Sequence, residues 1–341
     1  MVEIDGGHLE GGGQILRTAV GLSAVTAEPV HISHIRKGRD KPGLRPQHLH
    51  GIAAAGQICN AECQGLKMNS TEVTFNPGRI SGGTYLIDTR TAGSVTLVLQ
   101  TLVPIAICAN SPVELIIRGG TAVPFSPSID YFRHVFCSML GMYGVSMELE
   151  VRHHGFYPKG GGEVFARIIP SDMRVFRLKY RGSVNKIRVW ITASNHLKTA
   201  KVAERILDGF SMVFSDPDLT LSYVDASSPG CFITACACCD HSMIGASALG
   251  KRGRPAEEVG QNAADSLKKA IETDASVDVW MVDQLIPFMA LATHRTGGSS
   301  EVCIPSLTKH AQTNIWVTQK FLGVSFSMEK DVLKCTKIHE Y

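Results

Sequence analysis

Apolar and polar positions along the chain follow a recurring order. Short β-prone runs, VEID (2–5), GTYLIDT (83–89) and VELIIRGGT (113–121), each precede a glycine-containing turn and a longer apolar stretch. The longest apolar run, 96–109, is interrupted by Gln100 and Pro104 and is too short to span a bilayer, so it predicts a buried helix. The order of strand, turn and helix recurs without a fixed residue period, which predicts a repeated supersecondary unit in an α+β or α/β fold.

The pattern changes near residue 183. Residues 183–277 contain alternating strand-like runs, KIRVWITAS, LTLSYVD and CFITACACC, and two polar helical segments near 199–214 and 256–272. The apolar, glycine-punctuated pattern returns after residue 278. We therefore expect a large domain of repeated sheet-plus-helix units, formed by residues 1–182 and 278–341, with a smaller α/β domain inserted at 183–277.

Composition narrows the class of protein. The chain has 341 residues, of which 44% are hydrophobic, enough to build a sizeable core, and this excludes a mainly disordered protein. The formal charge of +3 excludes a generally basic nucleic-acid coat but leaves room for a local basic patch. The ten cysteines are scattered through apolar segments, as expected of reduced thiols, and the N-terminus lacks the pattern of a secretory signal. A cytoplasmic protein is expected, or a nuclear one if the source is eukaryotic.

The densest group of charges lies in a loop. Residues 36–45 carry five basic side chains and one acid among glycine and proline, between a predicted strand and a predicted helix. Lysine and arginine donors in such a loop suit phosphate oxygens. A solvated basic loop explains the same composition, so both interpretations stay open at this point.

A glycine-rich turn offers a second candidate. In EGGGQILR (10–17), three glycines permit close approach of a ligand to the backbone, Glu10 could hold a metal, and Arg17 could hold a phosphate. The turn is neither a dinucleotide fingerprint nor a Walker A loop. A generic start of a helix accounts for it equally well.

His310 is the candidate nucleophile. It follows a Pro/Ser/Thr loop at the opening of a predicted helix, where the helix dipole disfavours imidazolium and leaves a neutral nitrogen available. A purely hydrogen-bonding role is the alternative.

Other polar residues receive plainer interpretations. The Cys236–Cys238–Cys239 run invites a zinc hypothesis, but its strand pattern places Cys239 on the opposite face, and no second Cys/His pair stands at the spacing of a zinc finger. We therefore favour a reduced strand. Asp130 is interpreted as a helix cap. Asp283 lies within an apolar helix and so needs a polar partner or a cleft.

Taken together, these segments resemble the RNA 3′-terminal phosphate cyclase family. The resemblance covers nearly the whole chain, in the ordered segments EGGGQILR, IRKGRDKPGLRPQHL, SVTLVLQTLVP, RGGTAVPFSP, HGFYPKGGGEV and DQLIPFMALA, and it ends at His310. It implies the fold described above. It also implies ATP-dependent conversion of an RNA 3′-phosphate to a 2′,3′-cyclic phosphate, through a covalent adenylyl-histidine and an RNA adenylate.

The resemblance also implies roles for individual residues. His310 would be the adenylylated nucleophile, and Glu10 would hold a divalent metal, Mg or Mn, near the triphosphate of ATP. Phosphates of ATP or of the RNA end would be held by Arg17, Arg36, Arg39, Gln47 and His48. The nucleotide site would further include Gln14, Gln100, Pro124, Trp280, Met281, Val282, Asp283 and Gln284. Trp280 would stack on adenine where the family carries tyrosine.

The sequence is also compatible with two alternative functions. A relative within this family serves in ribosomal RNA processing without cyclase chemistry and lacks the nucleophilic histidine, so a non-catalytic RNA-processing scaffold is the second hypothesis. His310, Glu10 and the basic loop favour catalysis. Enolpyruvyl transferases resemble this family in fold but use no nucleotidyl-histidine, and they rank third.

Overall fold

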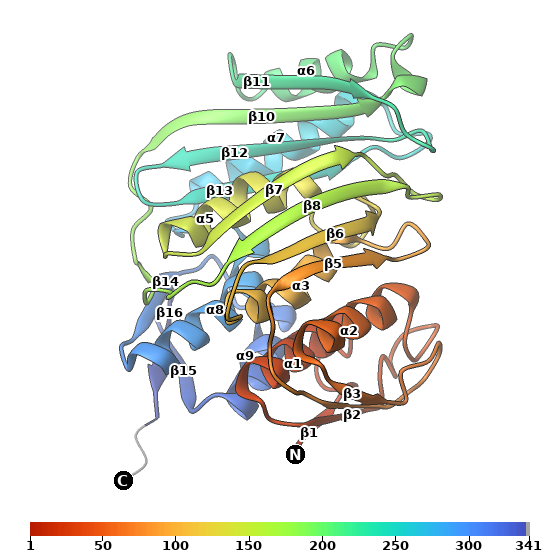
Figure 1. Cartoon of the computed structure of the whole chain (residues 1–341). Helices are drawn as coiled ribbons and strands as arrows, with labels where there is room; N and C mark the ends of the chain where they lie inside the picture. The colour runs from red at the N-terminus through yellow and green to blue at the C-terminus, as the bar shows by residue number, and fades with distance from the viewer. Residues whose placement is uncertain (339–341) are drawn as a thin grey trace.

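The computed structural model describes residues 1–338 and shows a mixed α/β protein (Figure 1). The described residues form four four-stranded sheets. Each sheet is mixed, because it contains both parallel and antiparallel strand pairs. The strand orders are β1-β2-β4-β3, β5-β6-β8-β7, β15-β16-β14-β9 and β11-β10-β12-β13.

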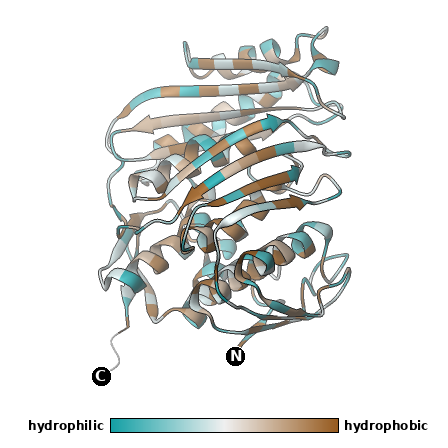
Figure 2. Ribbon diagram, in the orientation of Figure 1, coloured by the Kyte–Doolittle hydropathy of each residue, from teal (hydrophilic) through white to brown (hydrophobic). Residues whose placement is uncertain are grey.

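The first two sheets come from the N-terminal half of the chain. Their strands are β1 (Val2–Asp5), β2 (Val30–Ser33), β3 (Glu62–Gln64), β4 (Val73–Asn76), β5 (Gly83–Asp88), β6 (Val113–Gly119), β7 (Ser146–His153) and β8 (Gly162–Ile169). The helices that accompany them are α1 (Gly13–Thr26), α2 (Pro46–Cys59), α3 (Val95–Ala106), the short α4 (Ile129–Tyr131) and α5 (Cys137–Met142). Buried and more exposed positions alternate along β6 and β8, so one face of this sheet is buried, and hydrophobic residues dominate both strands (Figure 2).

The remaining sheets use the rest of the chain. One contains β10 (Val184–Ser194), β11 (Asp218–Val224), β12 (Cys231–Cys239) and β13 (Met243–Leu249), and it carries α6 (Val202–Ser211) and α7 (Ala256–Glu272). The other contains β9 (Arg177–Leu178), β14 (Ser300–Cys303), β15 (Val324–Glu329) and β16 (Val332–Lys337), with α8 (Val279–Thr296) and α9 (Lys309–Phe321). The parallel pairing of β9 with β14 joins the segments that flank residues 183–277.

Two hydrophobic clusters fill the interior. The larger draws on the N-terminal sheets together with α8 and α9. The smaller is built from β10, β12, β13, α6 and α7 alone. The alternation expected along β12 is confirmed, because Cys236 belongs to the larger cluster and Cys239 to the smaller. Residues 1–338 hold no group of three or more His, Cys, Asp or Glu side chains arranged to bind a metal.

Most expected elements are found close to their predicted positions. The apolar run at 96–109 forms α3, and the polar segment at 256–272 forms α7 with the same bounds. The segment near 199–214 is helical only over Val202–Ser211, and the left-handed conformation of Lys201 marks its start. The interpretation of Asp130 as a helix cap is wrong: Ser128 caps α4 by accepting a hydrogen bond from the Tyr131 amide, and Asp130 is buried.

No helix within residues 1–338 is long and apolar enough to cross a membrane.

The close crossing of α6 and α7 yields the first prediction. A Cβ at Gly260 would overlap the Ile206 carbonyl oxygen and lie 2.8 Å from the Phe210 amide nitrogen. We expect Gly260→Ala to lower the free energy of unfolding by about 1–3 kcal/mol, because both obstacles are backbone atoms. Gly141→Ala is the matched control, since a Cβ there meets nothing within 4 Å, and equal losses in urea unfolding would contradict the packing argument.

Candidate active site

The start of α1 brings two glycines against functional side chains. A Cβ at Gly12 would overlap the Glu10 carboxylate, and a Cβ at Gly13 would overlap Nε2 of His48. Gly11 has a φ of +60°, the left-handed region that favours glycine. The three glycines therefore allow Glu10 and His48 to lie close to the N-terminus of α1.

Glu10 lies between a cation and a histidine. Its Oε1 forms an ion pair with Arg39, and its Oε2 lies 3.9 Å from Nδ1 of His310. The Glu10 side chain is only 10% exposed, and Oε2 is buried without a hydrogen-bond partner. A buried carboxylate oxygen without a partner is unfavourable, so this atom is available for a cationic ligand.

A hydrogen-bonded chain sets the orientation of His310. Nε2 of Gln14 donates to Oδ2 of Asp283 at 2.9 Å, so the other amide atom, Oε1, faces Nδ1 of His310 at 2.5 Å. An amide oxygen can only accept, which requires that Nδ1 of His310 carries the proton. The lone pair of the neutral ring is then on Nε2.

The surroundings of His310 favour this neutral form. Burial lowers the pKa of His310 below its ordinary 6.5, and the positive charges of Arg17 and Arg39 lower it further. The ring remains half exposed at the second position of α9, whose first turn is capped by Thr308. His310 therefore combines an accessible, unprotonated nitrogen with a low tendency to become charged.

His48 is a second neutral imidazole. Burial lowers its pKa to about 3, assisted by the charges of Arg17, Arg36 and Arg45. The backbone amide of Arg45 donates to its Nδ1 at 3.2 Å, which places the proton on Nε2, the atom near Gly13. His48 is thus a fixed hydrogen-bond donor over the N-terminus of α1, and Gln47 precedes it in the first turn of α2, half-buried.

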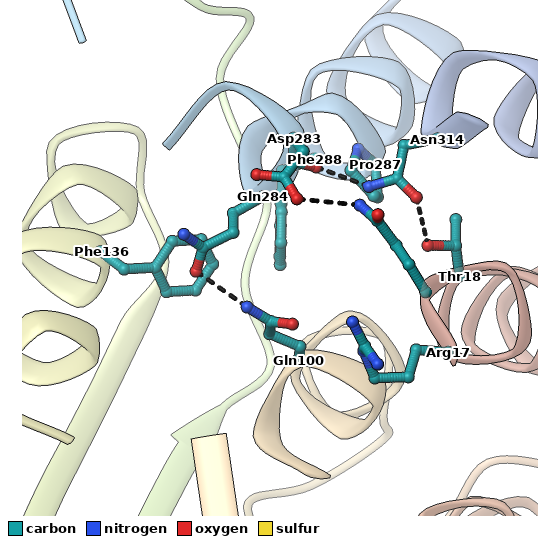
Figure 3. Close-up of a pocket in the computed structure, with 10 residues that line it drawn as sticks. Arg17, Thr18, Gln100, Phe136, Asp283, Gln284, Pro287, Phe288 and Asn314 are labelled. Carbon is teal, nitrogen blue, oxygen red and sulfur yellow. Dashed lines mark hydrogen bonds between the residues drawn. The ribbon is translucent and has the colours of Figure 1, made fainter. Parts of the chain in front are cut away.

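Arg17 and Asp283 line a small pocket between α1, α3, α8 and α9 (Figure 3). Its walls are formed by Gln14, Arg17, Thr18, Gln100, Phe136, Asp283, Gln284, Pro287, Phe288 and Asn314. Burial lowers the pKa of Arg17 to about 10, so it stays charged at neutral pH, and burial raises the pKa of Asp283 to about 7. The pocket thus contains one fixed cation and one acid that titrates near neutrality.

The residues expected around the nucleotide differ in how exposed they are and in which hydrogen bonds they form. Nε2 of Gln100 donates to Oε1 of Gln284 at 2.9 Å, and Gln284 donates to the Trp280 carbonyl at 2.7 Å. Trp280 is 64% exposed, so its ring is free to stack on a ligand, whereas Met281 and Val282 are buried in the core. Their side chains support the start of α8, which Asp278 caps by accepting from the Trp280 and Met281 amides.

The basic loop is ordered by its own arginines. Arg36, in a left-handed conformation, donates from Nη1 to the carbonyls of Lys41 at 2.8 Å and Gly43 at 3.3 Å. Arg45 donates to Asn69. These contacts fix the loop so that Arg39 reaches Glu10.

The expected site residues are therefore only partly brought together. Glu10, Gln14, Arg17, Arg39, His48, Asp283 and His310 form one cluster of direct contacts and mutual charge effects. Gln100, Gln284 and Trp280 form a second hydrogen-bonded chain. Pro124 is exposed in the loop after β6.

Sequence reasoning missed Thr18 and Asn314. Oγ1 of Thr18 donates to Oδ1 of Asn314 at 2.7 Å, and Nδ2 of Asn314 donates to the Asp283 carbonyl at 2.6 Å. Both residues are buried and hold α1, α8 and α9 together. The available signal was spacing, since Asn314 lies four residues after His310 and therefore on the same side of α9.

The fold and the site define a mixed α/β protein in which a histidine, the carboxylate of Glu10 and the arginines Arg17 and Arg39 lie together, a combination suited to phosphate groups. A family model described as RNA 3′-terminal phosphate cyclase matches residues 8–328. The chain belongs to this family.

Relatives with that name match almost end to end. The protein named RNA 3′-terminal phosphate cyclase from Methanosarcina barkeri is 45% identical over 335 residues, covering 97% of each chain. Its namesake from Thermococcus kodakarensis is 43% identical, covering 98% of this chain and 96% of its own, and that from Methanopyrus kandleri is 42% identical, covering 95% and 94%.

Among solved structures, the enolpyruvyl transferase NikO from Streptomyces tendae aligns with a TM-score of 0.42 and 10% identity. The alignment covers 98% of this chain and 48% of that one, so this chain spans about half the length of the other.

The titration of Asp283 gives a stability prediction. Its pKa rises from the ordinary 3.8 to about 7 in the fold, so the unfolded chain releases this proton at lower pH. The stability associated with the protonated carboxyl is complete below about pH 4, falls as pH rises, and is lost above about pH 7. Asp283→Asn keeps an oxygen for Gln14 and cannot ionise.

We therefore expect Asp283→Asn to raise the Tm relative to the native chain, and to raise it more at pH 8 than at pH 5. Thermal unfolding at both pH values measures this difference. A gain that is the same at both values would show that ionisation of Asp283 does not oppose folding.

Proposed function

We propose that the protein converts the 3′-terminal phosphate of RNA to a 2′,3′-cyclic phosphate at the expense of ATP, with His310 as nucleophile. The observation that carries the proposal is the Asp283–Gln14–His310 chain, which leaves Nε2 of a neutral imidazole unprotonated and accessible. Family membership and the names of the relatives support the overall reaction.

The reaction balances in three steps. Nε2 of His310 attacks the α-phosphorus of ATP, which forms the N–P bond and releases pyrophosphate. An oxygen of the RNA 3′-phosphate then attacks the same phosphorus, which returns the histidine and leaves AMP joined to the RNA through a phosphoanhydride. Finally the neighbouring 2′-hydroxyl attacks the RNA phosphate, closes the ring and expels AMP, a far better leaving group than phosphate oxygen.

The cations of the site match the charge that moves in these steps. Arg17 is half-buried and charged beside His310, and Arg39 forms an ion pair with the Glu10 carboxylate that also faces His310. In the proposal, Arg17, Arg36, Arg39, Gln47 and His48 hold phosphates of ATP or of the RNA end. Fixed donors in a partly buried site stabilise such charge more than they would in water.

The adenosine is assigned to the second group of residues. Trp280 offers an exposed ring for stacking on adenine, with Gln100, Gln284 and Pro124 as further contacts. Gln14 and Asp283 orient the nucleophile beside this site. The buried Met281 and Val282 contribute through the backbone at the start of α8.

Glu10 fits a divalent cation, Mg or Mn. Its buried Oε2 lacks a hydrogen-bond partner, as expected of an oxygen that awaits a cation. One protein carboxylate is a usual contribution to magnesium bound together with ATP phosphates. When bound, such an ion neutralises phosphate charge, and Glu10 must then share its carboxylate between the ion and Arg39.

The proposal includes the domain arrangement expected from the sequence. Residues 1–182 and 278–341 form the catalytic domain, and residues 183–277 form a smaller insertion. The separate hydrophobic cluster of the 183–277 segment supports this division. So does Arg181, which donates to the carbonyls of Ile271 and Ala275 and so joins the two connections where the chain leaves and returns.

Label transfer tests the nucleophile. Incubation with α-labelled ATP and Mg should leave labelled AMP on the protein as an acid-labile phosphoramidate, because the N–P bond hydrolyses in acid. His310→Ala should abolish the label, while His241→Ala, an exposed histidine in the β12–β13 turn, should retain it. Label on His310→Ala would refute the assignment, and a native protein that neither labels nor cyclises 3′-phosphorylated RNA would indicate a non-catalytic scaffold.

The pH dependence of label transfer tests the electrostatics. Its apparent pKa should lie below 6.5 in the native protein, because burial and two arginines disfavour the imidazolium. Arg39→Ala removes one of these charges and leaves Glu10 unpaired near His310, so it should raise the apparent pKa. Arg39→Lys keeps the charge and should restore the native profile; a profile unmoved in Arg39→Ala would contradict this account.

A further inference from the structure

A row of exposed cations lies on one edge of the molecule, outside the candidate active site. This basic edge consists of Arg90, Lys159, Lys198, Lys251, Arg252 and Arg254. All six residues are exposed, and none forms an ion pair with any residue in the described part of the chain. A cluster of unpaired cations attracts a polyanion. Because its members come from segments far apart in the sequence, neither composition nor net charge reveals this cluster.

The sheet topology explains why these residues meet. Strands β5 and β6 run parallel and end at this edge, and the β7–β8 connection turns there (Figure 1). Strands β10 and β11 are also parallel and end at the same edge, where β12 begins and β13 ends. The loops after these strands carry the cations, although the strands belong to two sheets.

Direct contacts join these loops into one surface. A Cβ at Gly160 would lie 2.7 Å from the Thr91 carbonyl oxygen, so the Lys159 loop lies on the Arg90 loop. The Lys159 amide donates to Oγ of Ser228 at 3.3 Å. The Gly250 amide donates to the Cys231 carbonyl at 2.8 Å, which places the 251–254 turn beside the start of β12.

The basic edge also reaches the candidate active site. Helix α2, which begins at Pro46 with Gln47 and His48, packs against β5, whose end carries Arg90. The charge of Arg90 contributes to lowering the pKa of His50, two residues beyond His48. The surface therefore starts next to residues assigned to phosphate binding and extends to the 183–277 segment.

Two exposed aromatic rings lie near these cations, Tyr157 on the Lys159 loop and Phe125 on the loop after β6. Phe125 is fully exposed, and its φ of +64° is an unusual conformation for a bulky residue. Tyr157 is 67% exposed. The bridge between Ala122 and Phe156 holds the two loops together. An exposed aromatic ring among cations suits a nucleobase, which stacks on the ring while its phosphates meet the cations.

Two acids near this edge already accept hydrogen bonds from neighbouring groups. Oδ1 of Asp88 accepts from the Arg90 amide at 2.7 Å, and Oδ1 of Asp225 accepts from Asn195 at 2.6 Å. The cations are spread along successive loops and are interleaved with single aromatic rings, as a strand of phosphates and bases requires. Neither ring belongs to an extended apolar patch of the kind that inserts into a lipid surface.

We propose that the basic edge binds single-stranded RNA upstream of the reacting 3′ end, with phosphates on its cations and bases on Phe125 and Tyr157. The inference rests on the proposed function for the direction of the strand. It assigns the 183–277 segment a role in binding the part of the RNA that lies outside the active site.

The test compares long and short substrates in the intact protein. Arg252→Glu/Arg254→Glu reverses two cations of the edge, and Arg79→Glu/Lys330→Glu reverses two exposed cations outside it as a matched control. With a 15-nucleotide RNA carrying a 3′-phosphate, the edge variant should raise the KM for cyclisation roughly tenfold while kcat stays unchanged. With a 3-nucleotide RNA, which is too short to extend from the active site to Arg252 and Arg254 in the 183–277 segment, KM should not change.

Binding of the same 15-nucleotide RNA with a 3′-hydroxyl provides a readout that needs no catalysis. In fluorescence anisotropy, the edge variant should lower the slope of log K against log salt by about 1.4, or about 0.7 for each lost contact on a single strand. The control variant should keep the native slope. The proposal would be overturned if the edge variant and the control variant bound the long RNA equally well. It would also be overturned if the edge variant lost binding to anionic vesicles or to an acidic peptide more than it lost binding to RNA. Failure of the native protein to cyclise any RNA would instead count against the proposed function and would leave the binding result to decide the edge.

Discussion

The side chain of Gln14 is the contact on which the site depends. One amide group links an acid on α8 to a histidine on α9, and the helix that carries it begins in the glycine-rich turn beside Glu10. Because an amide has a donor end and an acceptor end, the Asp283 carboxyl oxygen that accepts from Gln14 fixes which end meets His310 and so fixes the histidine tautomer. Thr18 and Asn314 hold the same three helices in register.

Burial determines the electrostatics around this contact. The same loss of solvent that raises the pKa of Asp283 to about 7 lowers that of His48 to about 3 and keeps His310 neutral. Arg17 remains charged because a guanidinium starts from so high a pKa that burial lowers it only to about 10. The site thus contains neutral imidazoles beside permanent cations, an arrangement that suits a nitrogen nucleophile and an incoming polyphosphate.

The fold separates the chemistry from a broad outer surface. Helix N-termini and glycine turns gather the polar residues of the pocket, whereas the ends of strands from two sheets gather the cations of the basic edge. Both the glycine-rich and basic loops near the pocket and the loops of the basic edge follow parallel strands. Parallel strands end at the same side of a sheet, so the loops that follow them lie together. The 183–277 segment adds a second set of such ends beside the first.

The sequence by itself determined the elements and most of the residue types at the site. The polar segment that starts after Pro255 predicted the bounds of α7, and the glycine turn, the basic loop and His310 stood out by spacing and composition. Local patterns work here because caps, turns and helix periods depend on neighbours along the chain. The prediction of the α4 cap was wrong, because serine and aspartate are both common caps and the sequence does not distinguish Ser128 from Asp130.

Only the tertiary structure decided that Gln14 joins Asp283, 269 residues away, to His310, 296 residues away, and that cations from four separate loops form one edge. Tautomers, shifted pKa values and unpaired charges depend on distances between remote segments, and those distances exist only after the sheets and helices have packed.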